Sequence, residues 1–396
     1  MNTRPLVPNE SSNLAALNAA GFTSTLLFVT ATGLEKAILD ATLPMRTMMR
    51  DAGVHDFATQ EKGPSNKVVK QAVILSDTGP VANSLSLYRP LTKDGDPRMW
   101  FYGFKEHAQA GDVFAIFIVA NQLHAMNLSR VHLGLNADDS RALRAFLSPF
   151  KQSAEQIAEE LLSKLRSLAQ DGPIRAICGG DTAVGMSIEA ALGIRPNSSR
   201  KPDYKGIELK SGRSAIGTRS NRATLFASVP DWQLSNCKSS AEILAKFGYT
   251  RGSDFKLYCT VSTLRPNSQL LQFRLAEAER YLHEEAVKTL ALPVAIWTLP
   301  QLEARLAEKH RETFWIKATS ETRSGSEWFH LKSVLHTRNP NIPQFERLVA
   351  EGAITMDHLI KRTPAGGAAE KGPLFKIQRN RIPELFLGEP VFHSLN

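Results

Sequence analysis

The sequence predicts an α+β protein with two domains, the C-terminal of which holds a mixed sheet flanked by helices. Its length of 396 residues is large for a single hydrophobic core. Short β-type runs fill most of residues 67–128, whereas helical and strand patterns alternate after residue 150. The composition, with 42% hydrophobic and 22% charged residues, is typical of a globular protein. We therefore expect a β-rich domain over residues 1–145 and a second domain over residues 150–396.

The N-terminal domain is expected to be small and β-rich, and a barrel is one architecture that fits. The first twenty residues are polar and rich in Asn and Ser, which predicts a loose arm. An apolar run from Ser24 to Thr30 indicates a strand, and one helix is expected over Gly33–Asp51. Further strands are predicted at Lys67–Leu75, Ser84–Tyr88, Met99–Phe104, Val113–Ala120 and Leu123–Leu128.

The C-terminal domain is expected to open with a helix that Ser153 can cap and that Asp171-Gly172-Pro173 ends. A second helix passes through Ile188 and Glu189 and ends at Gly193, and a strand from Ile207 to Lys210 follows. The remaining predicted elements are strands at Asp254–Val261, Leu270–Leu275, Val294–Thr298, Thr313–Thr319, Trp328–Leu335, Thr355–Lys361 and Leu374–Gln378, and a helix at Gln344–Glu351.

The charge distribution favours a polyanionic partner for the C-terminal part. The chain carries a formal charge of +9. Residues 1–150 hold 14 Lys and Arg against 13 Asp and Glu, and the remainder holds 34 against 26. The excess of positive charge therefore lies in the second domain, where nucleic acid is a reasonable partner. A solvated basic surface without a partner fits the charge equally well.

Cysteine usage and hydropathy exclude several classes of protein. Cys178, Cys237 and Cys259 are an odd number and lack the spacing of a zinc site or a disulfide framework, so a reducing cytoplasm fits best. The longest apolar run, Val113 to Ala120, is too short to span a bilayer, so no membrane partner is expected.

The residues that carry most chemical information lie between Lys201 and Lys210. Ile207 and Leu209 alternate with Glu208 and Lys210, which places the acid and the lysine on one face of a half-buried strand. Asp203 lies just upstream, and Gly206 can close a turn between the two acids. Two carboxylates, with the carbonyl of Leu209 as a third ligand, would suit Mg²⁺. The lysine could orient or deprotonate a water, or stabilise developing charge.

This pattern also fits a surface strand with a plain salt bridge, which is about as frequent. Glu189 lies beside the apolar stripe of its helix and could face the same site, although a solvated acid is commoner there. Arg213, Arg219 and Arg222 follow the strand, where DNA phosphates would need partners. Taken singly, each of these arginines is a surface residue.

A family resemblance favours the catalytic interpretation. The motifs Gly180-Asp181-Thr182-Ala183-Val184-Gly185, Ile188-Glu189, Pro202-Asp203 and Ile207-Glu208-Leu209-Lys210 together resemble the MvaI/BcnI restriction endonuclease family. That family is related to the mismatch-repair nickase MutH within the PD-(D/E)xK nucleases. The short gap between Asp203 and Glu208 is more similar to the MvaI branch.

The resemblance implies a restriction-endonuclease-like fold and a set of site residues. Asp203 and Glu208 correspond to metal-binding acids, Lys210 to the catalytic lysine and Glu189 to a further acid of the site. Such enzymes act as Mg²⁺-dependent monomers on a short pseudopalindrome in double-stranded DNA. The base-reading region corresponds to Lys361, Arg362, Lys371 and Lys376, which makes a G/C-containing site plausible. Lys376 stands where the MvaI pattern has an arginine, so the recognised sequence stays open.

The N-terminal domain resembles the effector DNA-binding pseudobarrel of EcoRII. The resemblance is carried by Tyr88-Arg89-Pro90, Lys93 and Gly95-Asp96-Pro97-Arg98-Met99-Trp100. The two-domain plan is similar to that of UbaLAI-type enzymes, which are specific for CCWGG. It implies that Arg89, Lys93 and Arg98 contact DNA and that this domain binds a second copy of the site. A scaffold or protein-binding role is nearly as well supported, because the charge of this half is close to zero.

The sequence thus predicts a type II restriction endonuclease, with two alternatives. A MutH-like strand-specific nickase would keep the same chemistry. A DNA-binding regulator with a silent nuclease core is the other alternative, and the retained Asp203, Glu208 and Lys210 argue against it.

Overall fold

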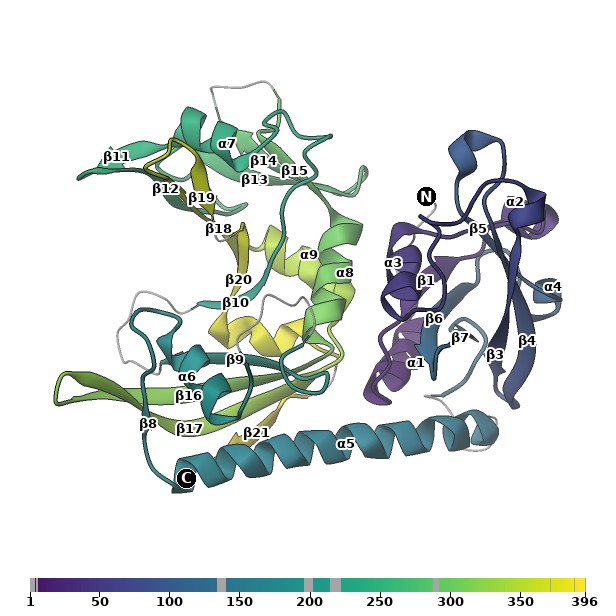
Figure 1. Ribbon diagram of the computed structural model, residues 1–396, viewed down its shortest axis with the longest axis horizontal. Coiled ribbons are helices and arrows are strands. Elements are labelled where there is room, and N and C mark those ends of the chain that lie inside the picture. The colour runs from purple at the N-terminus through teal and green to yellow at the C-terminus, as the bar shows by residue number, and fades with distance from the viewer. Residues whose placement is uncertain are drawn as a thin grey trace. The chain divides into compact units, whose positions relative to one another are not determined.

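The computed structural model describes residues 4, 6–133, 140–195, 202–213, 222–287, 292–370, 372–387 and 389–395 (Figure 1). The chain divides into two compact units, Met1–Ala158 and Glu159–Asn396. Helix α5 (Arg141–Gln170) crosses this division. Within the described ranges, no helix is long and apolar enough to cross a membrane.

The first unit is built on a seven-stranded sheet in the order β1-β6-β7-β3-β4-β5-β2. All neighbouring strands pair antiparallel except β3 and β7, which are parallel. The elements are α1 (Pro8–Ala19), β1 (Thr25–Phe28), α2 (Ala31–Glu35), β2 (Leu39–Asp40), α3 (Leu43–Asp51), η1 (Pro64–Asn66), β3 (Val68–Ser76), β4 (Gly79–Tyr88), η2 (Lys93–Gly95), β5 (Arg98–Phe101), α4 (Phe104–His107), β6 (Val113–Val119) and β7 (Gln122–Asn127).

Both faces of this sheet are covered, which explains the continuous apolar run of β6. Phe114 and Ile116 belong to one core cluster, which also contains Met45 and Met49 of α3. The alternate residue Phe117 belongs to a second cluster. That cluster takes in residues of α1 and of the first turns of α5, so period-2 alternation in β6 sends apolar side chains to both sides.

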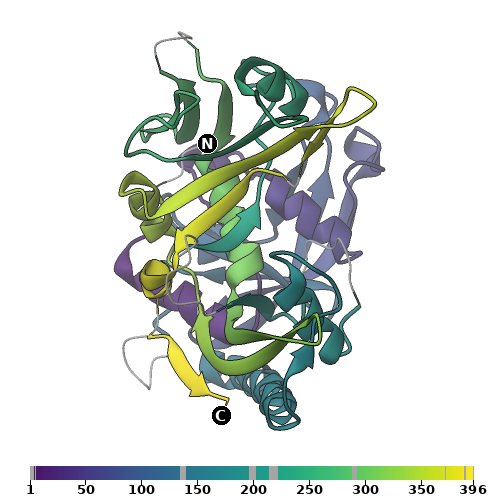
Figure 2. The same cartoon turned by 90° about the vertical axis from the view of Figure 1, so that its left-hand side faces the viewer.

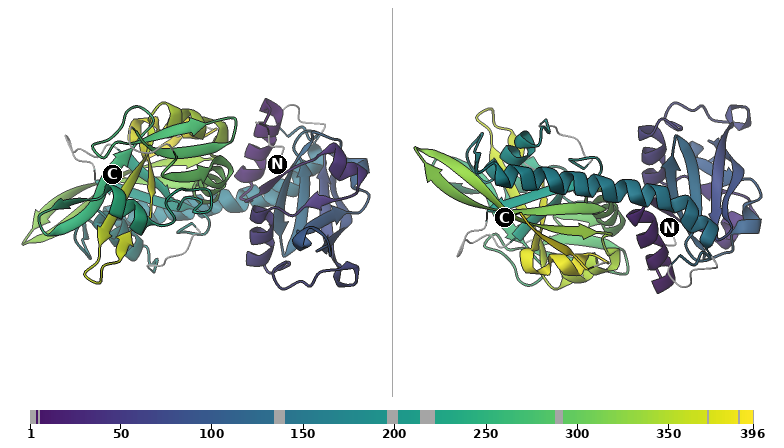
Figure 3. Two further views of the ribbon diagram at one scale, coloured as in Figure 1. Left: turned by 90° about the horizontal axis from the view of Figure 1, so that it is seen from above. Right: turned by 90° about the horizontal axis from the view of Figure 1, so that it is seen from below.

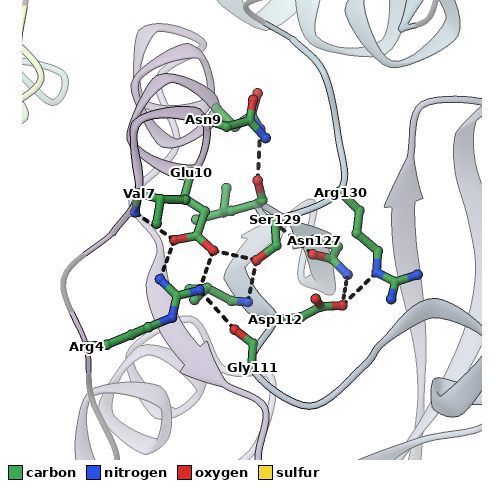
Figure 4. Close-up of polar contacts among 12 residues, drawn as sticks. Arg4, Val7, Asn9, Glu10, Gly111, Asp112, Asn127, Ser129 and Arg130 are labelled. Atoms are coloured by element: carbon green, nitrogen blue, oxygen red, sulfur yellow. Dashed lines mark hydrogen bonds and ion pairs between the residues drawn. The ribbon is translucent and has the colours of Figure 1, made fainter.

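The N-terminal arm expected from its polar composition is instead helix α1. Its Glu10 is 1% exposed and is bound by three groups: the Arg4 guanidinium at 2.6 and 2.7 Å, the Ser129 hydroxyl at 2.6 Å and the Val7 N–H at 3.0 Å (Figure 4). These hydrogen bonds lower the pKa of Glu10, although burial alone would raise it. The buried Asn13 donates to the carbonyls of Leu128 and Val131. Buried polar side chains therefore hold this helix in place. The prediction of a loose arm from the polar composition of the first twenty residues was wrong.

Two other helix predictions were wrong at their boundaries. The single helix expected over Gly33–Asp51 is broken into α2, the short strand β2 and α3, and Ala37 between them has a φ of 53°. The helix expected to begin at Ser153 begins at Arg141 and runs through Pro149. Ser153 is therefore an interior residue of α5 and not its cap.

The second unit contains three sheets. They are the strands β10-β20-β18-β12-β11 with β19 paired to β18, the strands β13-β14-β15, and the strands β21-β17-β16-β9 with β8 paired to β17 (Figure 2). The elements are β8 (Ile174–Arg175), α6 (Ala183–Ala191), β9 (Glu208–Arg213), β10 (Arg222–Ala227), α7 (Ser240–Phe247), β11 (Tyr249–Arg251), β12 (Asp254–Val261), β13 (Leu271–Ala276), β14 (Tyr281–Ala286), β15 (Ala295–Thr298), α8 (Leu299–His310), β16 (Glu312–Arg323), β17 (Ser326–Arg338), α9 (Ile342–Ala350), β18 (Ile354–Arg362), β19 (Ala368–Glu370), β20 (Leu374–Gln378), η3 (Arg379–Leu385) and β21 (Val391–Ser394).

The position of β9 is set by its parallel pairing with β16. Glu208 lies opposite Thr313 and Lys210 opposite Trp315, and the pairing ends at Arg213. The β16–β17 hairpin continues beyond that point to Arg323 and Ser326 and extends past its neighbours (Figure 3). On the other side, α6 packs against β9. The strand that carries the acid and the lysine is therefore held between a long hairpin and a helix.

One core joins most of the remaining elements of this unit. The buried Leu299, Leu302 and Leu306 form the apolar stripe of α8 and belong to the same cluster as Trp297 of β15 and Phe375 of β20. Helix α8 was not predicted, although its i, i+3, i+7 spacing is that of an amphipathic helix. The stripe brings the C-terminal end of α8 to β10 and to the start of β16, where His310 bonds to Leu225 and Thr313.

Candidate active site

A tight turn places Asp203 against the start of β9. Tyr204 and Ile207 exchange two backbone hydrogen bonds, of 2.9 and 2.7 Å. The two residues between them, Lys205 and Gly206, have φ values of 44° and 96°, as a type I′ turn requires. The chain therefore doubles back, and Asp203 Oδ2 accepts the backbone N–H of Leu209 at 2.9 Å.

Glu208 is buried and lies between two lysines. Its side chain is 1% exposed. Lys210 Nζ lies 2.6 Å from its Oε1, and Lys309 Nζ lies 3.0 Å from its Oε2. A buried carboxylate needs such partners, because an unpaired charge in this environment is costly. The two ammonium groups keep Glu208 in place.

Lys309 was not predicted as a site residue, because it comes from the last turn of α8. It is 101 positions away from Glu208 in the chain. The next residue, His310, is fully buried and bonds to Leu225 O at 2.9 Å and Thr313 Oγ1 at 3.0 Å. Burial lowers the pKa of His310 to about 3, so the ring is neutral at ordinary pH. We infer that His310 fixes the end of α8, which presents Lys309 to Glu208.

Helix α6 brings Glu189 to the same side of β9. A side chain at Gly185 would come within 3.2 Å of Ser211 Oγ, so glycine at this position permits the close approach of helix and strand. Burial and then the charge of Asp203 raise the pKa of Glu189. The charge of Glu208 acts on Glu189 in the same direction.

The carboxylates of this cluster outnumber its ammonium groups. Burial and then repulsion by Glu208 raise the pKa of Asp203, while the Leu209 N–H and the charge of Lys210 oppose the increase. If Glu189, Asp203 and Glu208 are all ionised, they exceed Lys210 and Lys309 by one negative charge. A bound cation would relieve this repulsion.

Two carboxylates and a carbonyl provide the hard oxygen donors that suit a magnesium ion. Asp203, Glu208 and the Leu209 carbonyl are the donors closest in sequence. Among the residues that the structure describes, no group of three or more His, Cys, Asp or Glu side chains stands ready to hold a metal ion. Each oxygen of Glu208 is paired with a lysine. A metal would therefore share this carboxylate with the two lysines or displace one of the lysines.

A second cation that the sequence did not reveal is Arg379, at the start of η3. Its guanidinium lies over Gly212 of β9, at a place that a β-carbon on residue 212 would occupy. Burial lowers the pKa of Arg379. No hydrogen bond or ion pair joins its side chain to another described residue, and the stretches of this unit outside the described ranges contain no Asp or Glu. Arg379 is thus a half-buried cation over Gly212, which lies two positions beyond Lys210 on β9, and no described acidic side chain pairs with it.

The comparison with protein families settles the class of protein. A model of the MvaI/BcnI restriction endonuclease family matches residues 162–386, which is more than half of the chain. The chain belongs to this family. Membership in a restriction endonuclease family makes the chain a DNA-binding hydrolase of the endodeoxyribonuclease class.

One solved structure with a TM-score above 0.5 agrees with the fold. The structure described as a restriction endonuclease MvaI–cognate DNA substrate complex is 18% identical, with a TM-score of 0.52, over 60% of this chain and 98% of that one. Restriction endonuclease MvaI in the absence of DNA is 15% identical, with a TM-score of 0.34, over 61% of this chain and 98% of that one. No curated protein sequence matches.

Most basic residues predicted to read DNA in this MvaI/BcnI unit have partners within the protein. Arg213 binds both oxygens of Glu327 at 2.7 Å. Lys361 pairs with Asp254 at 2.8 Å, and Arg362 stacks on Phe255. Arg219 and Lys371 lie outside the described residues.

The strongest basic network of the unit is centred on Asp357 of β18. Lys376 and Arg222 each lie 2.8 Å from one of its oxygens, and Thr260 donates to it at 2.7 Å. These bonds lower the pKa of Asp357, although burial opposes them. The network fixes Arg222 and Lys376 side by side, so neither is a freely moving surface cation.

In the first unit, the predicted DNA contacts are also engaged. Arg89 donates to the carbonyls of Gly95 at 2.9 Å, Gln60 at 3.1 Å and Phe57 at 3.3 Å. Arg98 is paired with Asp40 and lies 3.8 Å from Asp96. The side chain of Lys93 lies outside the described part of the structure.

Proposed function

We propose that this chain is a type II restriction endonuclease that hydrolyses phosphodiesters of double-stranded DNA with Mg²⁺. The observation that carries the proposal is the cluster on β9 of a restriction endonuclease family member: Asp203 bound to the Leu209 N–H, and Glu208 buried between Lys210 and Lys309. We assign this cluster to the PD-(D/E)xK arrangement of the MutH-like branch.

In this proposal Asp203, Glu208 and the carbonyl of Leu209 hold the metal, and Glu189 is the additional acid. Bound Mg²⁺ supplies charge neutralisation for the phosphodiester and lowers the pKa of a water molecule. The excess negative charge of the three carboxylates and the raised pKa values of Asp203 and Glu189 support a cation site here.

Lys210 donates one hydrogen bond to Glu208, and its ammonium group has two further N–H donors. It orients the attacking water or donates to the oxygen on which charge develops, which favours the transition state over the ground state. Lys309 is a positioning residue, because it acts on the reaction through Glu208. Its ammonium group, 3.0 Å from Oε2, fixes the orientation of that carboxylate.

Arg379 contacts a phosphate of the DNA in this proposal. Its charge is desolvated and has no acidic partner among the described residues, and a phosphate next to the scissile one would provide that partner. The glycine at position 212 leaves room for the guanidinium beside β9.

The recognised site is proposed to be short and to contain G·C pairs, read by Lys376, Arg222 and the basic residues near Lys361. CCWGG, the site of UbaLAI-type enzymes, is the first sequence to test. The first unit acts as an EcoRII-like pseudobarrel, and Arg89, Lys93 and Arg98 help it to hold a second copy of the site. The enzyme works as a monomer.

Cleavage of plasmid DNA with sequencing of the ends tests the proposal. The full chain is incubated with supercoiled plasmids that carry one copy, two copies or no copy of CCWGG, with Mg²⁺ or with EDTA. We expect linear products with uniform ends only when Mg²⁺ is present. Nicked circles that never become linear would support the MutH-like alternative, and DNA binding without any cut would support the silent regulator.

A further inference from the structure

The N-terminal unit contains a pocket of about 200 Å³ between α3 and the loop that follows it. Three arginines line it: Arg46 and Arg50 from α3 and Arg89 from the end of β4. Arg46 and Arg50 are one helical turn apart, so both can face the same space. The lining contains a single acid, Asp56. This concentration of positive charge contrasts with the near balance of charge over residues 1–150.

The side chain of Arg46 has no hydrogen-bond partner among the described residues, although it is partly buried. Its Nε is buried and has no hydrogen-bond partner among the described residues. Most buried polar atoms in folded proteins are satisfied, so an exception at the wall of a pocket indicates a ligand that supplies the missing acceptor.

The neighbouring arginine Arg89 is held in a fixed position. Its Nε and Nη1 donate to the carbonyls of Gly95, Gln60 and Phe57, which leaves Nη2 without a bond to another described residue. Such preorganisation lowers the entropy that a ligand contact would cost.

The remaining charges of the pocket do not neutralise these arginines. Arg50 contacts Asp51, but both side chains are more than half exposed, so this ion pair is weak. Asp56 turns one carboxylate oxygen to the N–H of Ala58 in its own loop. The pocket therefore offers guanidinium donors in excess of acceptors.

We propose that this pocket binds a phosphate group of DNA. A planar guanidinium donates two parallel hydrogen bonds to a phosphate, and Thr47 adds a hydroxyl to the lining. The pocket is smaller than most cofactor sites, which fits a single phosphate better than a whole nucleotide. The proposal rests on the proposed DNA-binding role of this unit. It extends that role to Arg46 and Arg50, beyond the turn around Arg89, Lys93 and Arg98.

Two measurements on the full chain test the proposal. In the first, hydrogen–deuterium exchange over residues 43–58 is followed on addition of inorganic phosphate or of a DNA duplex, in EDTA. In the second, the salt dependence of duplex binding is compared for wild type, Arg46→Gln and Arg130→Gln. Arg130 is the matched control, because it is a surface arginine of the same unit that pairs with Asp112 away from the pocket.

We expect the duplex to protect residues 43–58 in wild type and not in Arg46→Gln. We also expect Arg46→Gln, but not Arg130→Gln, to reduce the slope of log K against log salt by about 1, the value for one lost phosphate contact. The Arg46 side chain makes no hydrogen bond or ion pair with another described residue, so its substitution should leave the unfolding temperature close to that of wild type.

Protection by inorganic phosphate without protection by DNA would assign the pocket to a free anion and overturn the DNA proposal. Equal salt slopes for both variants, with no protection of residues 43–58 in wild type, would refute the proposal that the pocket binds any phosphate group. Neither result depends on catalysis. A chain that cuts plasmid DNA in Mg²⁺ and shows equal slopes would refute the pocket alone, whereas a chain that never cuts would refute the nuclease proposal.

Discussion

Replacing Lys309 by Met tests how the cluster on β9 balances its charges. The substitution removes one of two cations from Glu208 and keeps an apolar stem of similar length. Loss of a hydrogen bond to a charged group costs about 1.5–3 kcal/mol. The full cost of an unpaired buried charge, about 3–5 kcal/mol, should not be reached, because Lys210 remains 2.6 Å from Oε1. We therefore expect a loss of about 2 kcal/mol in the free energy of unfolding in EDTA.

Thermal unfolding makes this expectation measurable. In a unit of this size, about 1 kcal/mol corresponds to about 2–4 °C, so Lys309→Met should unfold about 4–8 °C below wild type in EDTA. Magnesium should restore part of the difference, because Lys309 no longer competes for the carboxylate. If the substitution raises Mg²⁺ affinity tenfold, magnesium should stabilise Lys309→Met by about 1.4 kcal/mol more than it stabilises wild type. This corresponds to a rise in unfolding temperature that is larger by about 3–6 °C.

The matched control is Lys317→Met, an exposed lysine of β16 with no contact to Glu208. Its unfolding temperature should stay close to that of wild type in both buffers. If Lys309→Met and wild type have the same unfolding temperature in EDTA, the pairing of Lys309 with Glu208 does not stabilise the fold. If magnesium stabilises wild type and Lys309→Met equally, Lys309 does not compete with a metal for Glu208, and this part of the account is wrong.

Two further predictions concern the phosphate contact and the pH dependence. Arg379→Met should slow DNA cleavage by about 30-fold, equivalent to about 2 kcal/mol of lost phosphate binding, and Arg379→Lys should recover part of the rate; equal single-turnover rates for wild type and Arg379→Met would exclude the contact. Because the pKa values of Asp203 and Glu189 are raised in the folded protein, the folded state binds more protons than the unfolded one as the pH rises past the ordinary carboxyl range. Stability in EDTA should therefore fall with rising pH through that window and level off above the raised pKa values, and Asp203→Asn should weaken the fall; urea midpoints that rise with pH over the same range would contradict this.

The local part of the candidate site could be predicted from the sequence. The alternation of Ile207, Glu208, Leu209 and Lys210 predicted a strand with the acid and the lysine on one face. The structure confirms the strand as β9, with the Lys210 ammonium 2.6 Å from Glu208. Gly206 was expected to close a turn after Asp203, and it occupies the second central position of that turn. These features depend on neighbours within a few residues, which a sequence displays directly.

The parts that depend on tertiary contacts could not be predicted. Lys309 reaches Glu208 only because the stripe of α8 packs into the core of the second unit, and Arg379 reaches Gly212 through the turn after β20. Nothing in the local sequence of either residue distinguishes it from a surface cation. Helix α1 shows a related limit, since its buried Glu10 and Asn13 contradict the apolar periodicity by which helices are recognised.

The breaks in the predicted helices have the same origin. The helical pattern over Gly33–Asp51 was interrupted by β2, whose Leu39 is buried in the sheet core opposite Met99 of β5. A pairing between strands so far apart in the chain can override a local helical preference.

The most direct test of the account is DNA cleavage by Asp203→Ala beside wild type, with binding of the same DNA measured in Ca²⁺ or EDTA. The account predicts that Mg²⁺-dependent cleavage is lost while the dissociation constant for the duplex changes little, because it assigns Asp203, which accepts the Leu209 N–H, to the metal and not to a base. Cleavage at the wild-type rate by Asp203→Ala would contradict the assignment of the active site to β9.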